Sequence, residues 1–333
     1  METSSSTSHR QLLENMNMKH NLLKIAAVVI LVTSCGQKKA EQFQALPFPD
    51  VFPPALMEDA QDRTEYMALN TWNRFVDPTR EYPSDSTLVS GVRKGDVEQK
   101  FATWCQVLDM SGHKTAYKAI NKLYDAALAC EKANASSNIF ETITELVEKY
   151  LFDPNSPYRN EDFYGVYVER LVTYSGISSE MKGKYLRDVR LCALNRVGTQ
   201  ATDFRFADRR GKIQTLYGVK APYTLLFFSN PGCDACMSII NVLKGEPRIS
   251  QMIASGLLAV LNIYIDEDLE AWRSYMPIYP DEWYNGFDPD FVIRNEELYN
   301  VRAIPSLYLL DVNKTVLLKD APENRVFDYL VRL

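Results

Sequence analysis

The chain has 333 residues, of which 46% are hydrophobic and 24% charged, and its formal net charge is −6. This length is sufficient for two domains of ordinary size, and the composition is typical of a globular protein. The mildly negative net charge does not suit the phosphate backbone of nucleic acid, so we expect no nucleic-acid partner. The sequence also has no Walker-type glycine-rich loop and no pair of histidines at helical spacing, which excludes two common catalytic signatures.

The N-terminus has the pattern of an export signal. Lys19 and Lys24 lead into an unbroken apolar run from Ile25 to Val32, and small residues then lead to Cys35. Charged, apolar and small residues in this order are typical of a signal peptide. The run is shorter than the ~20 residues of a permanent membrane helix. A buried core helix is the alternative reading, but no amphipathic period surrounds the run.

The stretch LVTSCG, which ends with Cys35 and Gly36, resembles the lipobox of bacterial lipoproteins. In that family the chain is cut before the cysteine, whose thiol receives a diacylglycerol. The resemblance implies that residues 1–35 hold a signal peptide with its lipobox and that Cys35 is a lipid anchor. It also implies a true start at Met16 or Met18. We therefore expect a cell-envelope protein that is lipid-anchored to a membrane and faces the periplasm, where disulfides persist, with the cell surface as the alternative. Which membrane holds the anchor stays open.

A tether and a helical domain are predicted next. Residues 36–54 are polar and then proline-rich, which is typical of a tether. Over 55–195 apolar side chains recur with the 3.6-residue period of helices, in about six segments separated by turn signals such as Asp153-Pro154-Asn155. This pattern predicts an all-α helical domain over 55–195. We find no catalytic constellation in it, and its role stays open.

Three cysteines of this helical domain, Cys105, Cys130 and Cys192, lie on apolar helical faces. Buried thiols are common core residues, so we expect core packing at all three positions. A disulfide between Cys105 and Cys130 is the alternative in an oxidising compartment, because sequence alone does not give the geometry that would decide.

Residues 196–333 change to an α/β pattern, in which buried strands are short apolar runs bounded by turn signals. Strands are predicted on both sides of a turn at Arg210-Gly211 and over 223–229, 257–265, 306–312 and 315–319. Helices are predicted over 235–244 and after 320–323. Strand, helix, strand, hairpin and helix form an α/β layer.

Cys233 and Cys236 stand between the predicted strand 223–229 and the helix that follows it. Unpaired N–H groups at a helix start stabilise negative charge, so a thiol there loses its proton more easily. We expect Cys233 to be the exposed nucleophile that attacks a partner disulfide. Cys236, one turn further in, would resolve the mixed disulfide. No organic cofactor is expected beyond this redox-active pair.

Two competing chemistries fit the residues less well. A structural zinc site needs four ligands, but no further cysteine follows Cys192 apart from the pair itself, and the three histidines all lie upstream. We therefore expect no metal. Peroxiredoxins carry Pro-x-x-x-Thr/Ser-x-x-Cys, whereas Leu226 and Asn230 occupy the first two of these positions before Cys233. A peroxiredoxin-like peroxidase is accordingly the least favoured alternative.

In VRAIPSLYLLD, the pair Ile304-Pro305 directly precedes a buried strand, a position that suits a proline without an N–H. Together with CDAC, this segment resembles the thioredoxin fold, in which a cis-proline faces the cysteine pair. The resemblance implies that Ile304 and Pro305 form the substrate-binding loop. The segment 197–218 resembles the opening of the periplasmic reductase and peroxiredoxin-like branch. The whole plan resembles thioredoxin-like bacterial lipoproteins with an N-terminal helical domain of unknown function.

Three features depart from this family. Phe227 stands where many thioredoxins have a buried aspartate, and Asp234 places a negative charge beside the pair, which opposes thiolate formation. The segment 266–303 is longer than a minimal thioredoxin needs, and we predict an inserted helix and loop there. Its aromatic residues Trp272, Trp283 and Tyr284 are expected to pack in the core, with a partner-contact groove as the alternative.

The sequence therefore predicts an α/β thioredoxin-like domain over 196–333, preceded by an all-α helical domain. The expected function is that of an extracytoplasmic, lipid-anchored thiol–disulfide oxidoreductase that acts on cysteine pairs of exported proteins. An upstream redox donor or acceptor must reset Cys233 and Cys236 after each cycle. The alternative is a non-catalytic binding lipoprotein whose cysteines form a static disulfide. Whether the protein is a reductant, an oxidant or an isomerase stays open.

Overall fold

The computed structural model describes residues 44–80, 82 and 87–333. The predicted signal peptide, Cys35 and the first part of the predicted tether lie outside the described residues. Residues Leu46–Leu333 form one compact unit. None of the helices in the described part of the chain combines the length and apolar character needed to cross a membrane.

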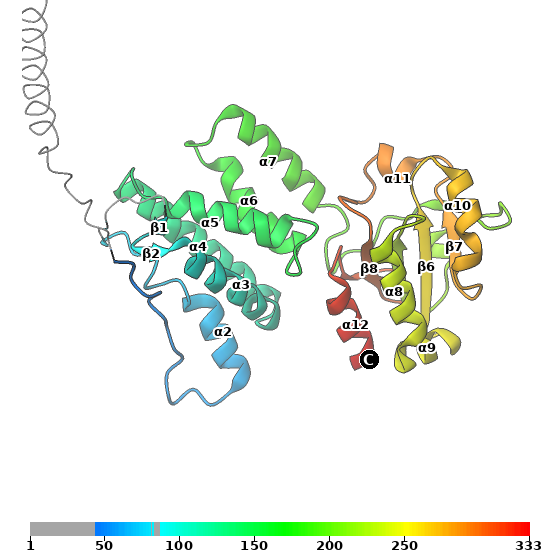
Figure 1. Ribbon diagram of the computed structural model, residues 1–333, viewed down its shortest axis with the longest axis horizontal. Helices are drawn as coiled ribbons and strands as arrows, with labels where there is room; N and C mark the ends of the chain where they lie inside the picture. Colours follow the sequence, from blue (N-terminus) through cyan, green and yellow to red (C-terminus); the bar gives the residue numbers. More distant parts are fainter. Residues whose placement is uncertain (1–43, 81, 83–86) are drawn as a thin grey trace, which may run out of the picture. The chain divides into compact units, whose positions relative to one another are not determined.

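Six α-helices precede the main sheet in the described residues, which agrees with the helical periodicity of this region (Figure 1). They are α2 (Ala60–Asn70), α3 (Lys94–Met110), α4 (His113–Ala133), α5 (Ile139–Val147), α6 (Glu161–Thr173) and α7 (Ser179–Cys192). A π-helical turn, η1 (Glu148–Phe152), follows α5, and a hairpin of β1 (Leu88–Val89) and β2 (Val92–Arg93) precedes α3. The hairpin was not predicted, because strands of two residues leave no period to detect.

Aromatic side chains form much of the core of the helical region. Trp72 packs edge-on against Trp104, with ring centroids 5.9 Å apart, and both rings contact Phe101. The indole N–H of Trp104 donates to the carbonyl of Ala68 at 2.9 Å, which joins α3 to α2. This hydrogen bond satisfies the buried indole N–H and fixes the orientation of the ring.

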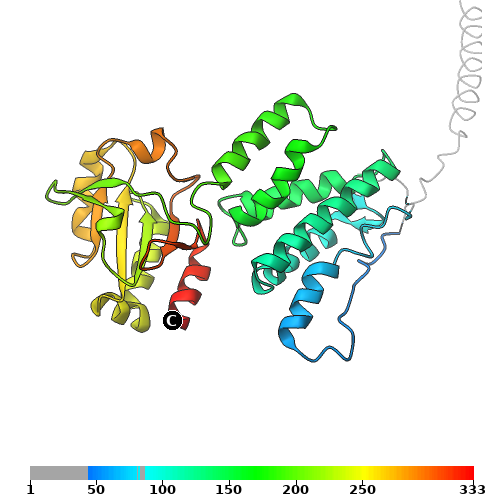
Figure 2. The same cartoon turned by 180° about the vertical axis from the view of Figure 1, so that it is seen from behind.

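A seven-stranded mixed sheet follows in the described residues, with the order β4-β3-β7-β6-β5-β8-β9. Figure 2 shows strands of this sheet from behind, with the C-terminal helix α12 beside them. The central strands β5, β6 and β7 are mutually parallel, and every other pairing is antiparallel. The strands are β3 (Arg205–Asp208), β4 (Ile213–Thr215), β5 (Tyr223–Phe228), β6 (Leu258–Tyr264), β7 (Tyr284–Phe287), β8 (Ser306–Leu310) and β9 (Val316–Leu318).

Both faces of the central strands are buried, as the continuous apolar runs predict. Leu225 and Phe227 point to one face, where α8, α9, α10 and α12 pack, and Leu226 and Phe228 point to the other. The helical elements are η2 (Leu216–Gly218), α8 (Asp234–Gly245), α9 (Pro247–Ala254), α10 (Leu269–Tyr275), η3 (Met276–Ile278), α11 (Val292–Asn295) and α12 (Glu323–Arg332).

The segment 266–303 differs from the helix and loop predicted for it, because it also contains β7, which lies between β3 and β6. The sequence of β7, Tyr-Asn-Gly-Phe, has no apolar alternation that would predict a strand. Gly286 is required there, since a Cβ atom would lie 2.7 Å from the carbonyl oxygen of Ala207 on β3. Trp272 and Trp283 are 2% and 5% exposed in the core beside this strand.

The end of β8 provides a test of this packing. Leu310 is fully buried and belongs to the core on the second face of the sheet, whereas Val312, two residues later, is 64% exposed. We expect Leu310→Ala to lower the free energy of unfolding by about 2–5 kcal/mol, because it leaves a cavity in a closely packed core. Val312→Ala should change it by less than about 0.5 kcal/mol. Urea denaturation of both variants measures the difference, and equal losses would contradict the assigned burial.

Candidate functional site: a disulfide at a helix start beside a cis-proline loop

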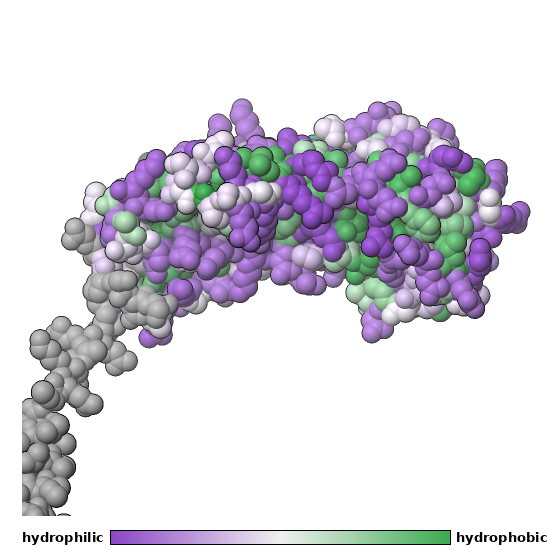
Figure 3. Space-filling view, turned by 90° about the horizontal axis from the view of Figure 1, so that it is seen from above, coloured by the Kyte–Doolittle hydropathy of each residue, from purple (hydrophilic) through white to green (hydrophobic). Residues whose placement is uncertain are grey.

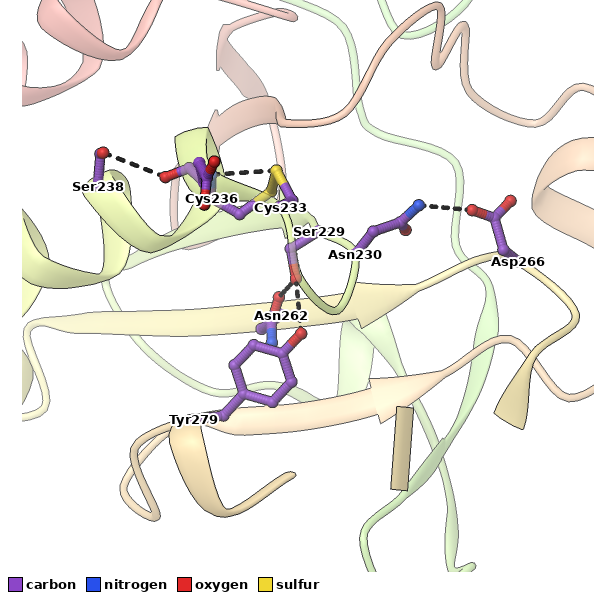
Figure 4. The surroundings of a disulfide bond; sticks show 9 residues. Ser229, Asn230, Cys233, Cys236, Ser238, Asn262, Asp266 and Tyr279 are labelled. Atoms are coloured by element: carbon purple, nitrogen blue, oxygen red, sulfur yellow. Dashed lines mark hydrogen bonds between the residues drawn. A yellow bond between two sulfur atoms is a disulfide. The ribbon is translucent and has the colours of Figure 1, made fainter. Parts of the chain in front are cut away.

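The cysteine pair lies in a turn between a buried strand and a helix. β5 ends at Phe228, and α8 begins at Asp234, so that Cys233 is the N-cap residue of α8. Gly232, directly before it, has a φ of +72°, a conformation that glycine adopts without steric cost. Cys233 and Cys236 form a disulfide with their Cα atoms 5.2 Å apart (Figure 4).

The two sulfur atoms differ in accessibility. Cys233 is half-buried at the surface, while Cys236 is 2% exposed and packs in the same core cluster as Phe227 and Ile239. Thiol–disulfide exchange requires access to the attacked or attacking sulfur. A macromolecular partner can therefore reach Cys233, whereas Cys236 is reached only through Cys233. The sequence predicted Cys233 to be the more exposed of the two cysteines, and the structure shows this difference in exposure.

The start of α8 directs one backbone hydrogen-bond donor at the sulfur of Cys233. The backbone N–H of Cys236 donates to Sγ of Cys233 at 3.1 Å (Figure 4). After reduction the same N–H, together with the helix dipole of the 12-residue α8, stabilises a thiolate at this position. Asp234, in the first turn, is exposed to solvent, where water screens its charge.

The pairing of β5 with β8 brings a second loop to the disulfide. Phe228, the last residue of β5, pairs with Ser306, the first residue of β8. The residues after Phe228 and before Ser306 therefore meet at one edge of the sheet. The peptide bond between Ile304 and Pro305 is cis, and both residues are half-buried.

A pocket of about 530 Å³ joins these segments. Its walls include Ala235, which stands between the two cysteines, together with Ile304 and Pro305 of the cis-proline loop and Phe327 of α12. A pocket of this size lies within the ~300–1,000 Å³ range of ordinary ligand sites.

Figure 3 shows that hydrophobic side chains on one face of the molecule form small patches separated by hydrophilic ones.

A buried network of polar side chains lies under the turn that joins β5 to α8. The hydroxyl of Ser229 donates to Oδ1 of Asn262 on β6 and lies 3.5 Å from the hydroxyl of Tyr279 (Figure 4). The amide of Asn262 donates to Asn285 of β7 at 3.1 Å. This network attaches the inserted segment to β6 and to the turn that leads from β5 to the cysteines. Sequence reasoning missed it, although Asn262 interrupts an otherwise apolar run and was a usable signal.

The departures seen in the sequence persist in the fold. Phe227 is fully buried beside Cys236, so an apolar ring occupies the position of the carboxylate that many thioredoxins have. Among the described residues no group of three or more His, Cys, Asp or Glu side chains is arranged to hold a metal ion. Cys35, the predicted lipid anchor, is not among the described residues.

The fold and the site together define a thioredoxin-like protein: the cysteine pair starts a helix after a central strand, and a cis-proline precedes the neighbouring antiparallel strand. A solved thioredoxin-like protein from Bacteroides caccae ATCC 43185 is 37% identical, with a TM-score of 0.72 over 85% of this chain and 98% of that chain. The resemblance to the thioredoxin fold is thus confirmed for the α/β part that follows the helices.

Residues 7–195, which include the helical region, match a family model described as "Domain of unknown function (DUF5106)", and the chain belongs to this family. The C-terminal domain of an uncharacterized protein from Bacteroides fragilis NCTC 9343 is 50% identical over 41% of this chain and 98% of that chain, with a TM-score of 0.40. No protein of curated function matches the chain.

The three remaining described cysteines, Cys105, Cys130 and Cys192, are free and buried, so the alternative Cys105–Cys130 disulfide is absent from the structure. Burial raises the pKa of each thiol above its ordinary value. Their thiolate fraction at pH 8 is therefore lower than that of an exposed cysteine, and it is the thiolate that reacts.

This difference predicts the labelling pattern of the folded, reduced protein. Iodoacetamide at pH 8 should modify Cys233 first and leave Cys105, Cys130 and Cys192 unmodified, as measured by peptide mass spectrometry. The control is the same reaction in urea, where all of these thiols should be labelled. Native labelling of the helical-region cysteines at the rate of Cys233 would contradict their assigned burial.

Proposed function

We propose that the protein is a thiol–disulfide oxidoreductase that acts on cysteine pairs of exported proteins through Cys233 and Cys236. One observation carries the proposal: the Cys233–Cys236 disulfide caps a helix with one accessible and one buried sulfur, beside a cis-proline loop. A purely structural cross-link between residues three apart closes a very small loop, which by chain entropy contributes less than a long-range disulfide does.

The proposed cycle is written in the reducing direction. The Cys233 thiolate attacks one sulfur of a substrate disulfide, forms a mixed disulfide and releases the other substrate sulfur as a thiolate, which takes up a proton. The thiolate of Cys236 then attacks Sγ of Cys233 and releases the second substrate thiol. Two electrons pass to the substrate, and Cys233–Cys236 is left oxidised until a redox donor reduces it. Oxidation of a substrate dithiol runs the same steps in reverse and needs an acceptor.

Ile304 and Pro305 are proposed to hold the substrate backbone during this exchange. They lie at the sheet edge where the strand pairing brings the two loops together, and both line the pocket that Ala235 also lines. An extended peptide laid along this edge places its own cysteine next to Cys233. No organic cofactor is needed in this cycle, since the dithiol itself carries the electrons.

A redox titration tests the proposal. The purified protein is equilibrated in graded glutathione buffers, and the reduced fraction of Cys233 and Cys236 is measured by alkylation and mass spectrometry. We expect a reversible midpoint within the range of about −270 to −120 mV of catalytic pairs. The value gives the direction of electron flow. A pair that stays oxidised in every buffer would favour a static disulfide in a binding protein.

Two substitutions separate the roles of the cysteines. Cys233→Ser should abolish exchange with a disulfide-containing peptide, because it removes the accessible nucleophile. Cys236→Ser should form the mixed disulfide with the peptide and retain it, because the resolving thiol is lost. Mass spectrometry under non-reducing conditions measures the adduct. Rapid turnover by Cys236→Ser would contradict the assigned order.

Cys35 is proposed as the lipid anchor and the cell envelope as the location, with the protein facing the periplasm. The support is the order of residues before Cys35: basic, apolar, then small. Cys35→Ala should abolish incorporation of labelled fatty acid and block processing of the signal, so that the variant keeps a larger apparent mass. Cys130→Ala is the control, and label in the Cys35→Ala protein would contradict the proposal.

A further inference from the structure

A cluster of charged side chains is buried where the helical region contacts the cis-proline loop. Glu161, the first residue of α6, is 2% exposed. Its carboxylate lies 2.8 Å from Nε of Arg302 and 3.0 Å from Nζ of Lys319, and it accepts a hydrogen bond from the amide of Asn300 at 2.7 Å. Arg302 also pairs with Asp320 at 2.8 Å.

In this cluster the carboxylates of Glu161 and Asp320 face the cations of Arg302 and Lys319, and the buried guanidinium of Arg159 also interacts with both carboxylates. Burial raises the pKa of Glu161, and the two cations oppose this shift. Burial alone would lower the pKa of Arg302, but Glu161 and Asp320 more than compensate and raise it. Removal of one member leaves an uncompensated buried charge, whose cost is greater than that of losing a surface ion pair.

The cluster holds the cis-proline loop on both sides. Arg302 stands three residues before Pro305, and its guanidinium stacks 4.3 Å from the ring centroid of Phe152. Directly after Pro305, the hydroxyl of Ser306 donates to the carboxylate of Asp320 at 2.7 Å. The same loop is thus fixed before and after its proline by groups that converge on Glu161 and Asp320.

The helical region also forms part of the pocket beside the disulfide. Pro154, Asn155 and Arg159 line the pocket together with Ile304 and Pro305. Arg159 is 8% exposed and donates to the backbone carbonyls of Asp320 and Ala321, both at 3.0 Å. Residues 320–321, directly before α12, thus bond both to Arg159 of the helical region and, through Asp320, to Arg302 and Ser306 on either side of the cis-proline.

We propose that Glu161, acting through Arg302, is a positioning residue for the cis-proline loop, so that the helical region sets the geometry in which a substrate polypeptide binds beside Cys233. This inference rests on the proposed oxidoreductase function. It gives the helical region a role in substrate binding, since Glu161 does not contact the sulfur atoms and acts on the reaction only through the loop.

Glu161→Gln tests the proposal, because it keeps the size of the side chain and removes the charge that holds Arg302. The assay is turnover of a peptide cyclised by one disulfide, with dithiothreitol as reductant. We expect KM for the peptide to rise at least fivefold while kcat stays within twofold. Reduction of Cys233–Cys236 by dithiothreitol alone should keep its rate, since this small reductant does not need the loop.

Two further variants separate positioning from stability. Glu161→Gln combined with Lys319→Met removes one charge of each sign, which restores the wild-type net charge of the cluster, and KM should stay raised. Arg325→Gln removes the ion pair with Asp109, which also connects α12 to the helical region, at 3.1 Å, without touching residues 302–306. It should leave KM unchanged. Recovery of KM in the double variant, or an equal rise in Arg325→Gln, would overturn the proposal.

Amide hydrogen exchange over residues 302–308 measures the loop without reference to activity. Exchange should be at least tenfold faster in Glu161→Gln than in the wild type, and unchanged in Arg325→Gln. If the wild type does not turn over the peptide while amide hydrogen exchange responds as expected, the proposed oxidoreductase function fails, but the role of Glu161 in holding the cis-proline loop is supported. If amide hydrogen exchange over residues 302–308 is unchanged in folded Glu161→Gln, Glu161 does not hold the cis-proline loop and the proposal is refuted.

Discussion

The pairing of β5 with β8 is the constraint on which the site depends. Because Phe228 is opposite Ser306, the chain that leaves one strand and the chain that enters the other come together at a single edge of the sheet. A shift by one residue would turn every side chain of β8 to the other face, and both faces are fully packed. The register is therefore fixed by the core, and the position of the cis-proline loop beside the cysteines follows from it.

Helix α8 places the two sulfur atoms of this site in different electrostatic surroundings. Its first turn supplies an N–H group to one sulfur, and its buried face encloses the other. The asymmetry between an accessible and a buried sulfur arises because Cys233 caps the helix at the surface, whereas Cys236 lies one turn inside it and packs against the core. Phe227 makes the surroundings of the inner sulfur apolar, which distinguishes this site from thioredoxins with a carboxylate there.

Much of this could be predicted from sequence, because the strongest signals are local. The continuous apolar runs gave β5, β6 and β8, and the position of Cys233 and Cys236 between strand and helix indicated their unequal exposure. The strand β7 was missed, since its identity depends on a close approach to β3 that only Gly286 permits. The cluster of Glu161 and Arg302 was missed for a related reason: its members are 141 residues apart in the sequence, and each is unremarkable in its own segment.

The burial of Cys105, Cys130 and Cys192 has a consequence for how the molecule matures. Among the residues that the structure describes, the folded chain leaves one cysteine sulfur, that of Cys233, accessible to another molecule. An unfolded chain presents all of its thiols at once, and any of them can pair wrongly with Cys233 or with another protein. Because the helical region precedes the α/β part in the sequence, its folding buries Cys105, Cys130 and Cys192 and withdraws these three thiols from oxidation.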